Sequence, residues 1–299
     1  MNPTTTVVIP TFKGEPFLAR ALNSLRKQSW QDFDVVVASD DGFDYRPLAQ
    51  SVMGERVRCV FTAKPASGPA AARHAALAVT AAPVVAFLDV DDEYPERRLE
   101  ALVPLALKHG AAGCNIQRID DATGEYLNNT CPPGKPVGGI MRQKHVPWVE
   151  GPVVPVVRRD CLPEYPHMWI FEDIFFLTRV IGRVGNALPM VDDESVNYRY
   201  LIQKKSLSYG TDKDEQMKAY YRTILQQAKE GGQLFEGVAQ EGRDAFWHGF
   251  TVRAKRDDAY SQAKLLEPHL DFQTFAPRYD GMMQQLISEI PEHLRAWAP

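Results

Sequence analysis

The chain has 299 residues, of which 44% are hydrophobic and 24% are charged. This mix is typical of an ordinary globular protein and excludes the collagen-like and intrinsically disordered classes. Lysine and arginine number 34 against 38 aspartates and glutamates, which gives a net charge of −4. The chain lacks the basic excess of a dedicated nucleic-acid binder, so no nucleic-acid partner is expected.

Signals for membranes and secretion are absent from the sequence pattern. No apolar stretch reaches the roughly 18 residues that a membrane-spanning helix needs. The longest candidate, Ala75–Leu88, is interrupted by Thr80 and Pro83. The N-terminus has no basic segment of the kind that begins a signal peptide. The four cysteines are far apart, which favours neither a zinc site nor a disulfide framework. We expect a cytoplasmic protein, with peripheral association at the inner membrane face as an open alternative.

Short apolar runs alternate with helical patterns over residues 1–115. Strands are expected at Val7–Ile9, Val35–Val37, Val57–Phe61 and Val84–Leu88. Helices are expected at Phe17–Leu25, Gly68–Val79 and Leu99–Leu107. Strands that are apolar on both faces are typical of a parallel sheet covered by helices. Repeated strand–helix units make the fold class α/β.

The middle of the chain is less regular. The expected elements there are a hairpin over Asn115–Leu127, a loop over Cys131–Gly139, strands over Val153–Val157 and Ser195–Leu201, and a helix over Glu172–Ile181. Proline and glycine mark the loop, and the turn of the hairpin falls at residues 121–124.

From Asp212 onward the pattern becomes helical. Apolar side chains recur at helical spacing at Met217, Tyr220, Tyr221, Ile224, Leu225 and Ala228. Gly231 and Gly232 end this helix, and Phe246 and Phe250 belong to a later one. An exposed stripe of this size would favour aggregation. We therefore expect it to pack on the N-terminal part of the chain or on a second copy.

Polar residues follow the predicted strands, where ligands bind in open α/β sheets. They are Pro10 and Thr11 after the first strand, Asp40 and Asp41 after the second, and Asp89, Asp91 and Asp92 after the fourth. Three carboxylates within four residues repel one another, and a divalent cation such as Mg²⁺ or Mn²⁺ would compensate their charge. The alternative is that Asp91 and Asp92 cap the helix that follows.

Two other acidic motifs fit less well. A calcium loop requires glycine at its sixth position, whereas Pro95 follows this acidic group. A nucleophile of the haloacid dehalogenase type is followed by Thr or Val four residues later, and that position is Glu93.

Six motifs, in order, resemble inverting glycosyltransferases of family 2, which have the GT-A fold. The resemblance covers about residues 5–210. Its motifs are Val7–Phe12, the helix segment Leu22–Ser29, Val36–Gly42, Gly68–Arg73, Phe87–Asp92 (similar to the DxD motif) and Phe171–Asp173 (similar to the ED motif), followed by Tyr198–Arg199 and Ser206–Ser208. The implied organisation is a GT-A catalytic domain at 1–210 and a helical region at 211–299. The catalytic domain would divide into a nucleotide-sugar half at 1–115 and an acceptor half at 116–210.

The resemblance also implies roles for individual residues. The nucleotide-sugar site would contain Pro10, Thr11, Phe12, Asp40, Asp41, Arg73, Asp89, Val90 and Asp91. Asp41 would accept a hydrogen bond from the base, Asp89 and Asp91 would hold ribose and metal, and Asp92 would be a further metal ligand. The cofactor would be Mn²⁺ or Mg²⁺. Asp173, with Glu172 beside it, would be the catalytic base.

Two positions depart from the family pattern. The residue after Arg73 is often Asn in the family, but it is His74 here. Many members carry a metal-binding His two residues beyond the Tyr-Arg pair, and Leu201 occupies that position, followed by Gln203, Lys204 and Lys205. The metal would then depend more on Asp91, diphosphate and water, or a lysine would replace part of its charge.

The chemistry of sugar transfer agrees with these roles. A divalent ion stabilises the negative charge of the departing diphosphate. A carboxylate at Asp173 would take the proton of the attacking hydroxyl. Alternatively, Glu172 and Asp173 merely complement a helix dipole. Trp169 and Phe171 would form either an apolar platform for a sugar ring or part of the core.

Other polar residues are weaker candidates. His167 lies near the ED motif, Asp192–Glu194 is typical of a solvated turn, and Trp148 and Glu150 belong to the acceptor side by chain order alone. We expect transfer from a nucleotide-diphosphate sugar, in particular a UDP-sugar, to an acceptor that is a saccharide, a lipid-linked group or a protein. The alternatives are an inactive binding module and a nucleotidyltransferase. A nucleotidyltransferase would carry a glycine-rich basic loop after the first strand, which Phe12–Glu15 lacks. A homo-oligomer through the C-terminal helices is also expected.

Overall fold

The computed structural model describes residues 3–131, 139–149, 151, 153–166, 168, 170–203, 214–270 and 272–295. It divides the chain into two compact units. Unit 1 comprises residues 1–141 and 150–202, and unit 2 comprises residues 142–149 and 203–299.

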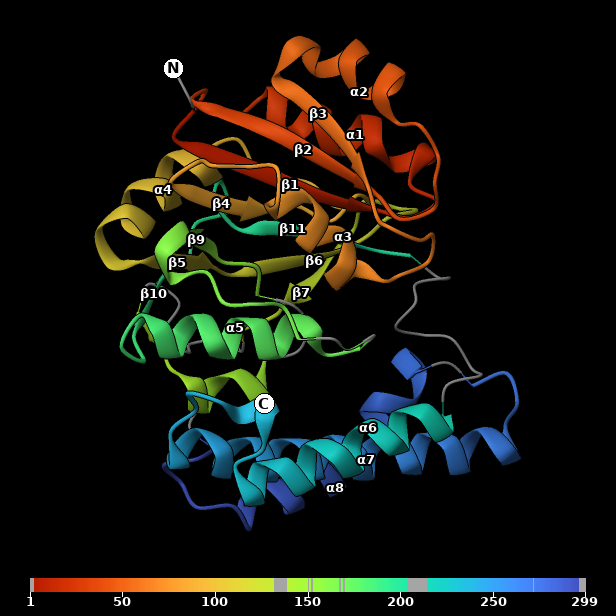
Figure 1. Ribbon diagram of the computed structural model, residues 1–299. Helices are drawn as coiled ribbons and strands as arrows, with labels where there is room; N and C mark the ends of the chain where they lie inside the picture. The colour runs from red at the N-terminus through yellow and green to blue at the C-terminus, as the bar shows by residue number, and fades with distance from the viewer. Residues whose placement is uncertain are drawn as a thin grey trace. The chain divides into compact units, whose positions relative to one another are not determined.

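Unit 1 is built on a sheet whose first four strands are parallel. They lie in the order β3-β2-β1-β4, with bounds β1 Thr5–Thr11, β2 Phe33–Ser39, β3 Val57–Phe61 and β4 Val84–Phe87. Figure 1 shows these strands side by side. Valine and isoleucine dominate β1 and β2, because branched side chains pack well on a pleated surface. The strands predicted in this half are confirmed, each within a few residues.

Helices connect these strands. They are α1 (Glu15–Arg26), α2 (Arg46–Met53), α3 (Pro69–Leu77) and α4 (Arg98–His109). Pro69 occupies the first turn of α3, where its missing N–H costs no hydrogen bond. Gly68, directly before α3, has φ 95°, a backbone conformation that is strained for residues other than glycine. The sequence did not predict α2, which is only eight residues long.

The parallel arrangement predicted for the first four strands is confirmed, and beyond β4 the sheet is mixed. β9 (Val156–Arg158) pairs antiparallel with β4 on one side and with β5 (Ala111–Cys114) on the other. β10 (Leu188–Val191) is parallel to β5, and β8 (Ile140–Met141) is antiparallel to β10. The predicted strand at Val153–Val157 therefore exists as β9. Its direction depends on a chain reversal that no local pattern specifies.

A second sheet of three strands completes unit 1. Its order is β11-β6-β7, with β6 at Ile116–Asp120, β7 at Tyr126–Asn129 and β11 at Tyr198–Ile202. β6 and β7 form the predicted antiparallel hairpin, and β11 is parallel to β6. Glu93 and Arg199 form an isolated antiparallel bridge, so the segment after β4 is attached to this sheet. Helix α5 (Glu172–Arg183) confirms the helix predicted at 172–181.

Unit 2 consists of helices α6 (Asp214–Glu230), α7 (Gln240–Leu266) and α8 (Phe272–Ser288), with the short 3-10 helix η2 (Gln143–Trp148). α7 contacts α6, α8 and η2 (Figure 1). Gly249 on α7 allows this close approach, because a Cβ there would lie 2.8 Å from the Cβ of Pro147.

The apolar stripe of α6 packs against α7 within unit 2. Its buried members are Tyr221, Ile224 and Ala228. The Tyr221 ring meets Phe250 of α7 edge-on, and its hydroxyl donates to Asp257 at 2.5 Å. The reason is that α7 carries a second apolar surface, which covers the first.

The domain division expected at residue 210 falls within 204–213, outside the described residues. Residues 142–149 group with the C-terminal helices, although the sequence analysis assigned them to the acceptor half. In the part of the chain that the structure describes, no helix combines the length and the apolar character needed to cross a bilayer.

Candidate active site

The carboxyl ends of β1, β2 and β4 bring the predicted site residues of the N-terminal half to one edge of the sheet. Thr11 is in register with Ser39, and the amide of Asp40 donates to the carbonyl oxygen of Thr11 at 2.8 Å. A Cβ on Gly14 would lie 2.7 Å from Thr11 and from Val90, so the loops after β1 and β4 are in close contact. Phe12 is 45% exposed at this edge.

Asp40 is buried and organises the entrance to α3. Its carboxylate accepts hydrogen bonds from the hydroxyl of Thr62 at 2.8 Å, the amide of Ser67 at 2.9 Å and the amide of Gly68 at 2.8 Å. These partners saturate much of its bonding capacity. Asp40 therefore shapes the loop that begins α3.

Asp41 is more exposed and ties together the loops after β1 and β2. It accepts hydrogen bonds from the hydroxyl of Tyr45 at 2.7 Å, the amide of Phe43 at 2.9 Å, the amide of Lys13 at 2.5 Å and the hydroxyl of Ser39 at 3.0 Å. Partial burial acts to raise the pKa of Asp41, but these bonds together hold it below its ordinary value. Asp41 is thus an ionised acceptor at this edge. Tyr45, which the sequence analysis missed, also accepts from the amide of Gly14.

Asp89 and Asp91 follow β4, and both side chains are partly exposed. Burial raises the pKa of Asp91 to about 6, and the negative charge of Asp89 acts in the same direction. Two neighbouring carboxylates of this kind are hard oxygen ligands suited to Mg²⁺ or Mn²⁺. Among the described residues, no group of three or more His, Cys, Asp or Glu side chains could hold a metal by itself. The donor set fits an ion that receives its remaining ligands from diphosphate and water.

Asp92 is enclosed by β11. Its side chain is buried, with the residue 1% exposed, and its oxygens accept from the hydroxyl of Tyr198 at 2.7 Å and the amide of Leu201 at 2.9 Å. Burial raises the pKa of Asp92 well above its ordinary value. The same Tyr198 hydroxyl accepts from the amide of Asp89 at 3.1 Å. Both carboxylate oxygens of Asp92 therefore accept hydrogen bonds from β11, and these bonds fasten the β4 loop to that strand.

Arg73 joins the two acidic motifs. One guanidinium nitrogen donates to Asp89 at 2.8 Å and another to Glu172 at 3.1 Å, although Glu172 lies 99 residues further along the chain. Arg73 is 6% exposed and sits over the ring of Tyr165, at 5.0 Å from its centroid. Burial acts against the charged form, but Tyr165 and the surrounding carboxylates raise the pKa of Arg73 above its ordinary value. This permanent charge offsets the repulsion between the two motifs.

Helix α5 begins at the second acidic motif. Phe171 before it adopts the left-handed conformation with φ 69°, a strained state for a bulky residue that recurs at functional sites. Glu172 is buried against Arg73, whereas Asp173 is partly exposed. Burial raises the pKa of both carboxyl groups, and the charge of Asp173 further raises that of Glu172. A carboxylate with a raised pKa is a better proton acceptor near neutral pH, so Asp173 suits a general base.

Some of the weaker candidates can be placed and others cannot. His74 accepts a hydrogen bond from the amide of Tyr165 at 3.3 Å, and Leu201 is buried. Trp148 is buried within η2 of unit 2. The structure does not describe Glu150, His167, Trp169, Lys204, Lys205 and the segment 206–208. Tyr165 and Tyr198 were not predicted as site residues, because their role depends on neighbours far along the chain.

Comparisons with known proteins identify the fold and the family. Residues 6–160 match the sequence profile described as Glycosyl transferase family 2. The structure resembles that of S. aureus TarS 1-349 in complex with UDP-GlcNAc, with a TM-score of 0.64 and 16% identity over 99% of this chain and 84% of that one. The fold is therefore the GT-A fold of glycosyltransferases. Because the profile covers half of its length, the chain belongs to glycosyltransferase family 2.

Curated relatives match part of the chain. The Erwinia amylovora "Amylovoran biosynthesis glycosyltransferase AmsB" is 31% identical over 99 residues, which are 31% of this chain and 33% of the relative. The Escherichia coli "UDP-Glc:alpha-D-GlcNAc-diphosphoundecaprenol beta-1,3-glucosyltransferase WfgD" is 26% identical over 103 residues, which are 34% of this chain and 41% of that protein. The matched region thus spans well under half of each relative.

Replacing Asp40 by alanine is expected to destabilise unit 1. The change leaves the amides of Ser67 and Gly68 without their carboxylate, and an unsatisfied buried group costs ~1–3 kcal/mol. Urea unfolding monitored by tryptophan fluorescence measures the change. Asp44→Ala is the control, because Asp44 lies in the same loop and pairs with Arg46 on the surface. Equal stability of the two variants would contradict the structural role of Asp40.

A pH dependence is expected for the metal-free chain. The folded state holds the Asp91 proton more tightly than the unfolded state, because the pKa rises from 3.8 to about 6. Protonated Asp91 therefore stabilises the folded state fully at pH values below the pKa of the unfolded state. This stabilisation is lost as the pH rises through the pKa of the folded state. In EDTA, Asp91→Asn should stabilise the chain by ~1–2 kcal/mol more at about pH 7.5 than at about pH 5. Thermal unfolding at both pH values tests this, and a pH-independent difference contradicts it.

Proposed function

We propose that this chain is an inverting glycosyltransferase that moves a sugar from a nucleotide-diphosphate donor, in particular a UDP-sugar, to an acceptor hydroxyl. One observation carries the proposal. Arg73 bonds both Asp89 after β4 and Glu172 at the start of α5, so the two acidic motifs share one edge of the sheet. A site for the donor diphosphate thus adjoins a candidate base for the acceptor.

The nucleotide would bind at the loops after β1 and β2. Asp41 is an ionised acceptor there, suited to the N–H of a uracil base, and the exposed ring of Phe12 offers an apolar surface. Pro10, Thr11 and Val90 would line this edge. The donor specificity is supported by the name of the relative WfgD, which acts on UDP-Glc, and by the fold neighbour solved with UDP-GlcNAc.

Asp89 and Asp91 would hold a divalent cation. Mn²⁺ or Mg²⁺ bound there would stabilise the negative charge of the departing diphosphate. Arg73 keeps Asp89 in place and adds a fixed positive charge beside it. Asp92 would support the loop from β11 without binding the ion.

Asp173 would act as the general base. A base must lie on the face of the sugar ring opposite the diphosphate, where the acceptor hydroxyl attacks and configuration inverts. Asp173 is partly exposed and its pKa is raised, so it can accept the hydroxyl proton. Glu172 would orient this site through Arg73, because its carboxylate is already bonded.

Calorimetric titration of UDP, with Mn²⁺ and with EDTA, tests the donor site. We expect tight binding only with the metal. Hydrolysis of UDP-sugars, followed by UDP release, tests turnover. Absence of UDP binding under both conditions would overturn the proposal. UDP binding without hydrolysis or transfer would indicate a binding module, and release of diphosphate from UTP and a sugar phosphate would indicate a nucleotidyltransferase.

The donor sugar and the acceptor can be sought in sequence. A ligand at 100 times its Kd stabilises a protein by ~2.7 kcal/mol, so a thermal-shift screen of UDP-sugars ranks donors. Because WfgD is named for a diphosphoundecaprenol-linked acceptor, saccharides linked to polyprenyl diphosphate are the first acceptors to assay. Such an acceptor would require peripheral membrane association of the chain.

A further inference from the structure

A row of polar side chains runs along helix α1 and past its C-terminal end. Arg20, Ser24 and Gln28 follow one another at intervals of four residues. Arg20 and Ser24 lie on one side of α1, and Gln28 follows the last residue of that helix. Ser24 and Gln28 are buried. The Ser24 hydroxyl accepts from the amide of Tyr94 at 3.0 Å, and the Gln28 side-chain amide donates to the carbonyl oxygen of Pro95 at 2.6 Å. The row therefore binds the backbone of the segment that follows the DxD motif.

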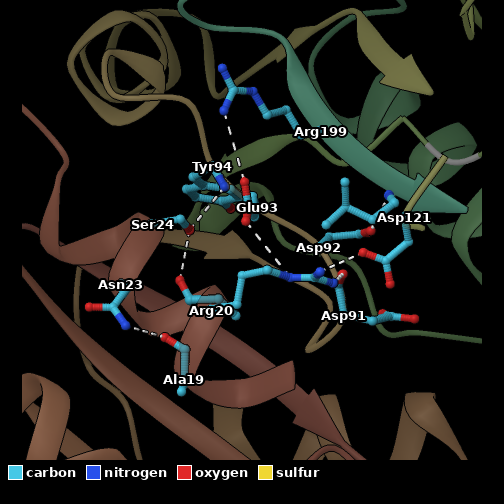
Figure 2. A network of polar contacts seen from close by, with 12 residues as sticks. Ala19, Arg20, Asn23, Ser24, Asp91, Asp92, Glu93, Tyr94, Asp121 and Arg199 are labelled. Carbon is cyan, nitrogen blue, oxygen red and sulfur yellow. Dashed lines mark hydrogen bonds and ion pairs between the residues drawn. The ribbon is translucent and has the colours of Figure 1, made fainter. Parts of the chain in front are cut away.

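Arg20 is the member of this row that contacts the DxD motif itself. One of its terminal nitrogens donates to the carbonyl oxygen of Asp91 at 2.7 Å, and the other donates to the carboxylate of Asp121 at 2.5 Å. Its Nε lies 3.7 Å from Glu93, which in turn is 3.9 Å from Arg199 of β11. Figure 2 shows Arg20 between Asp121 and Glu93, with its guanidinium directed at Asp91.

We propose that Arg20 is a positioning residue that fixes Asp91 for metal-dependent binding of the donor diphosphate. The inference rests on the proposed function. A guanidinium is a rigid planar fork, so bonds to Asp91 and Asp121 at the same time fix the peptide group of Asp91 relative to β6. Its charge also reduces the repulsion among Glu93, Asp121 and the DxD carboxylates.

The contact is made to the backbone of Asp91, and this decides what Arg20 does. Its bond leaves the Asp91 carboxylate available to a cation while holding the loop that carries it. Arg20 therefore acts on the proposed metal-binding residue Asp91 through its backbone. In this arrangement the arginine itself touches neither metal nor diphosphate. Loss of Arg20 should therefore loosen the loop even when no metal is present.

A cavity of about 880 Å³ lies beside the network. Arg20, Glu93, Asp121 and Arg199 all line it. A small solute can therefore reach the position that the guanidinium group occupies. This allows chemical rescue, in which free guanidinium replaces the missing side chain of an Arg20→Ala variant.

The first experiment needs no metal. Hydrogen–deuterium exchange in EDTA follows a peptide covering residues 88–94 in the unmodified chain, in Arg20→Ala and in the control Arg26→Ala. Arg26 is on the same helix but exposed. We expect exchange of this peptide to accelerate about tenfold in Arg20→Ala only, because a hydrogen bond from a charged donor is lost. Unchanged exchange would overturn the inference.

The second experiment measures UDP affinity with Mn²⁺. We expect the Kd to rise about tenfold in Arg20→Ala and to remain unchanged in Arg26→Ala. Guanidinium chloride at tens of millimolar, far below denaturing concentrations, should restore part of the affinity in Arg20→Ala alone. Arg20→Lys should stay weakened, since an ammonium group lacks the fork. Full affinity of Arg20→Ala would overturn the inference.

The outcomes separate this inference from the proposed function. If the unmodified chain does not bind UDP with Mn²⁺, the proposed function fails, while the exchange experiment still decides whether Arg20 holds the loop. If the unmodified chain binds and Arg20→Ala binds equally well, only the positioning role fails. Should Arg20→Ala not fold, Asp121→Asn takes its place, because it removes the negative charge that anchors the guanidinium and keeps Arg20. Normal exchange and normal affinity in Asp121→Asn would overturn the inference.

Discussion

Asp173→Asn is expected to reduce the rate of sugar transfer by about 10²- to 10⁴-fold, the range typical of losing a general base. Asparagine keeps the size and much of the hydrogen bonding of the side chain but cannot accept the proton of the acceptor hydroxyl. UDP affinity should remain close to that of the unmodified chain, because the role that we propose for Asp173 is to act on the acceptor. Transfer rate and UDP affinity are measured on the same purified variant.

The structure supplies a control for this experiment. Asp160 is an exposed carboxylate that pairs with Arg158, so Asp160→Asn changes charge equally without touching the site. Near-normal transfer by Asp173→Asn would refute the assignment. Loss of UDP binding in this variant would instead move Asp173 into the metal or nucleotide site.

The second large effect concerns the metal. Asp91→Asn should weaken UDP binding in the presence of Mn²⁺ by about tenfold or more, because an amide is a poorer ligand for a hard divalent cation than a carboxylate. The residual affinity should no longer respond to EDTA. Calorimetry with and without the metal measures both quantities.

Asp92→Asn is the matched comparison. Asp92 is adjacent in sequence, but its oxygens bond Tyr198 and Leu201. This variant should retain metal-dependent UDP binding, and its main effect should be on thermal stability. If Asp92→Asn abolished the metal dependence and Asp91→Asn did not, the roles that we infer for the two aspartates would be reversed.

The sequence by itself determined the fold class, because local patterns carry the information. Apolar runs such as Val35–Val37 specify buried strands, and Pro69 after a glycine specifies the start of α3. The order of the acidic motifs also indicated the family. Asp41, Asp89 and Asp91 could be predicted to lie close together because they directly follow strands whose carboxyl ends lie at one edge of a parallel sheet.

Only the tertiary structure decided what each carboxylate does. Asp91 and Asp92 are neighbours in the chain, yet one is partly exposed and the other is enclosed by Tyr198, which lies 106 residues away. Arg73 bonds Glu172 across 99 residues, and Arg20 bonds Asp121 across 101. Hydrogen bonds between such distant segments form only when the sheets bring them together, and no spacing along the chain encodes them. Local pattern therefore identified where acidic groups gather, and packing determined which of them is left to bind a ligand.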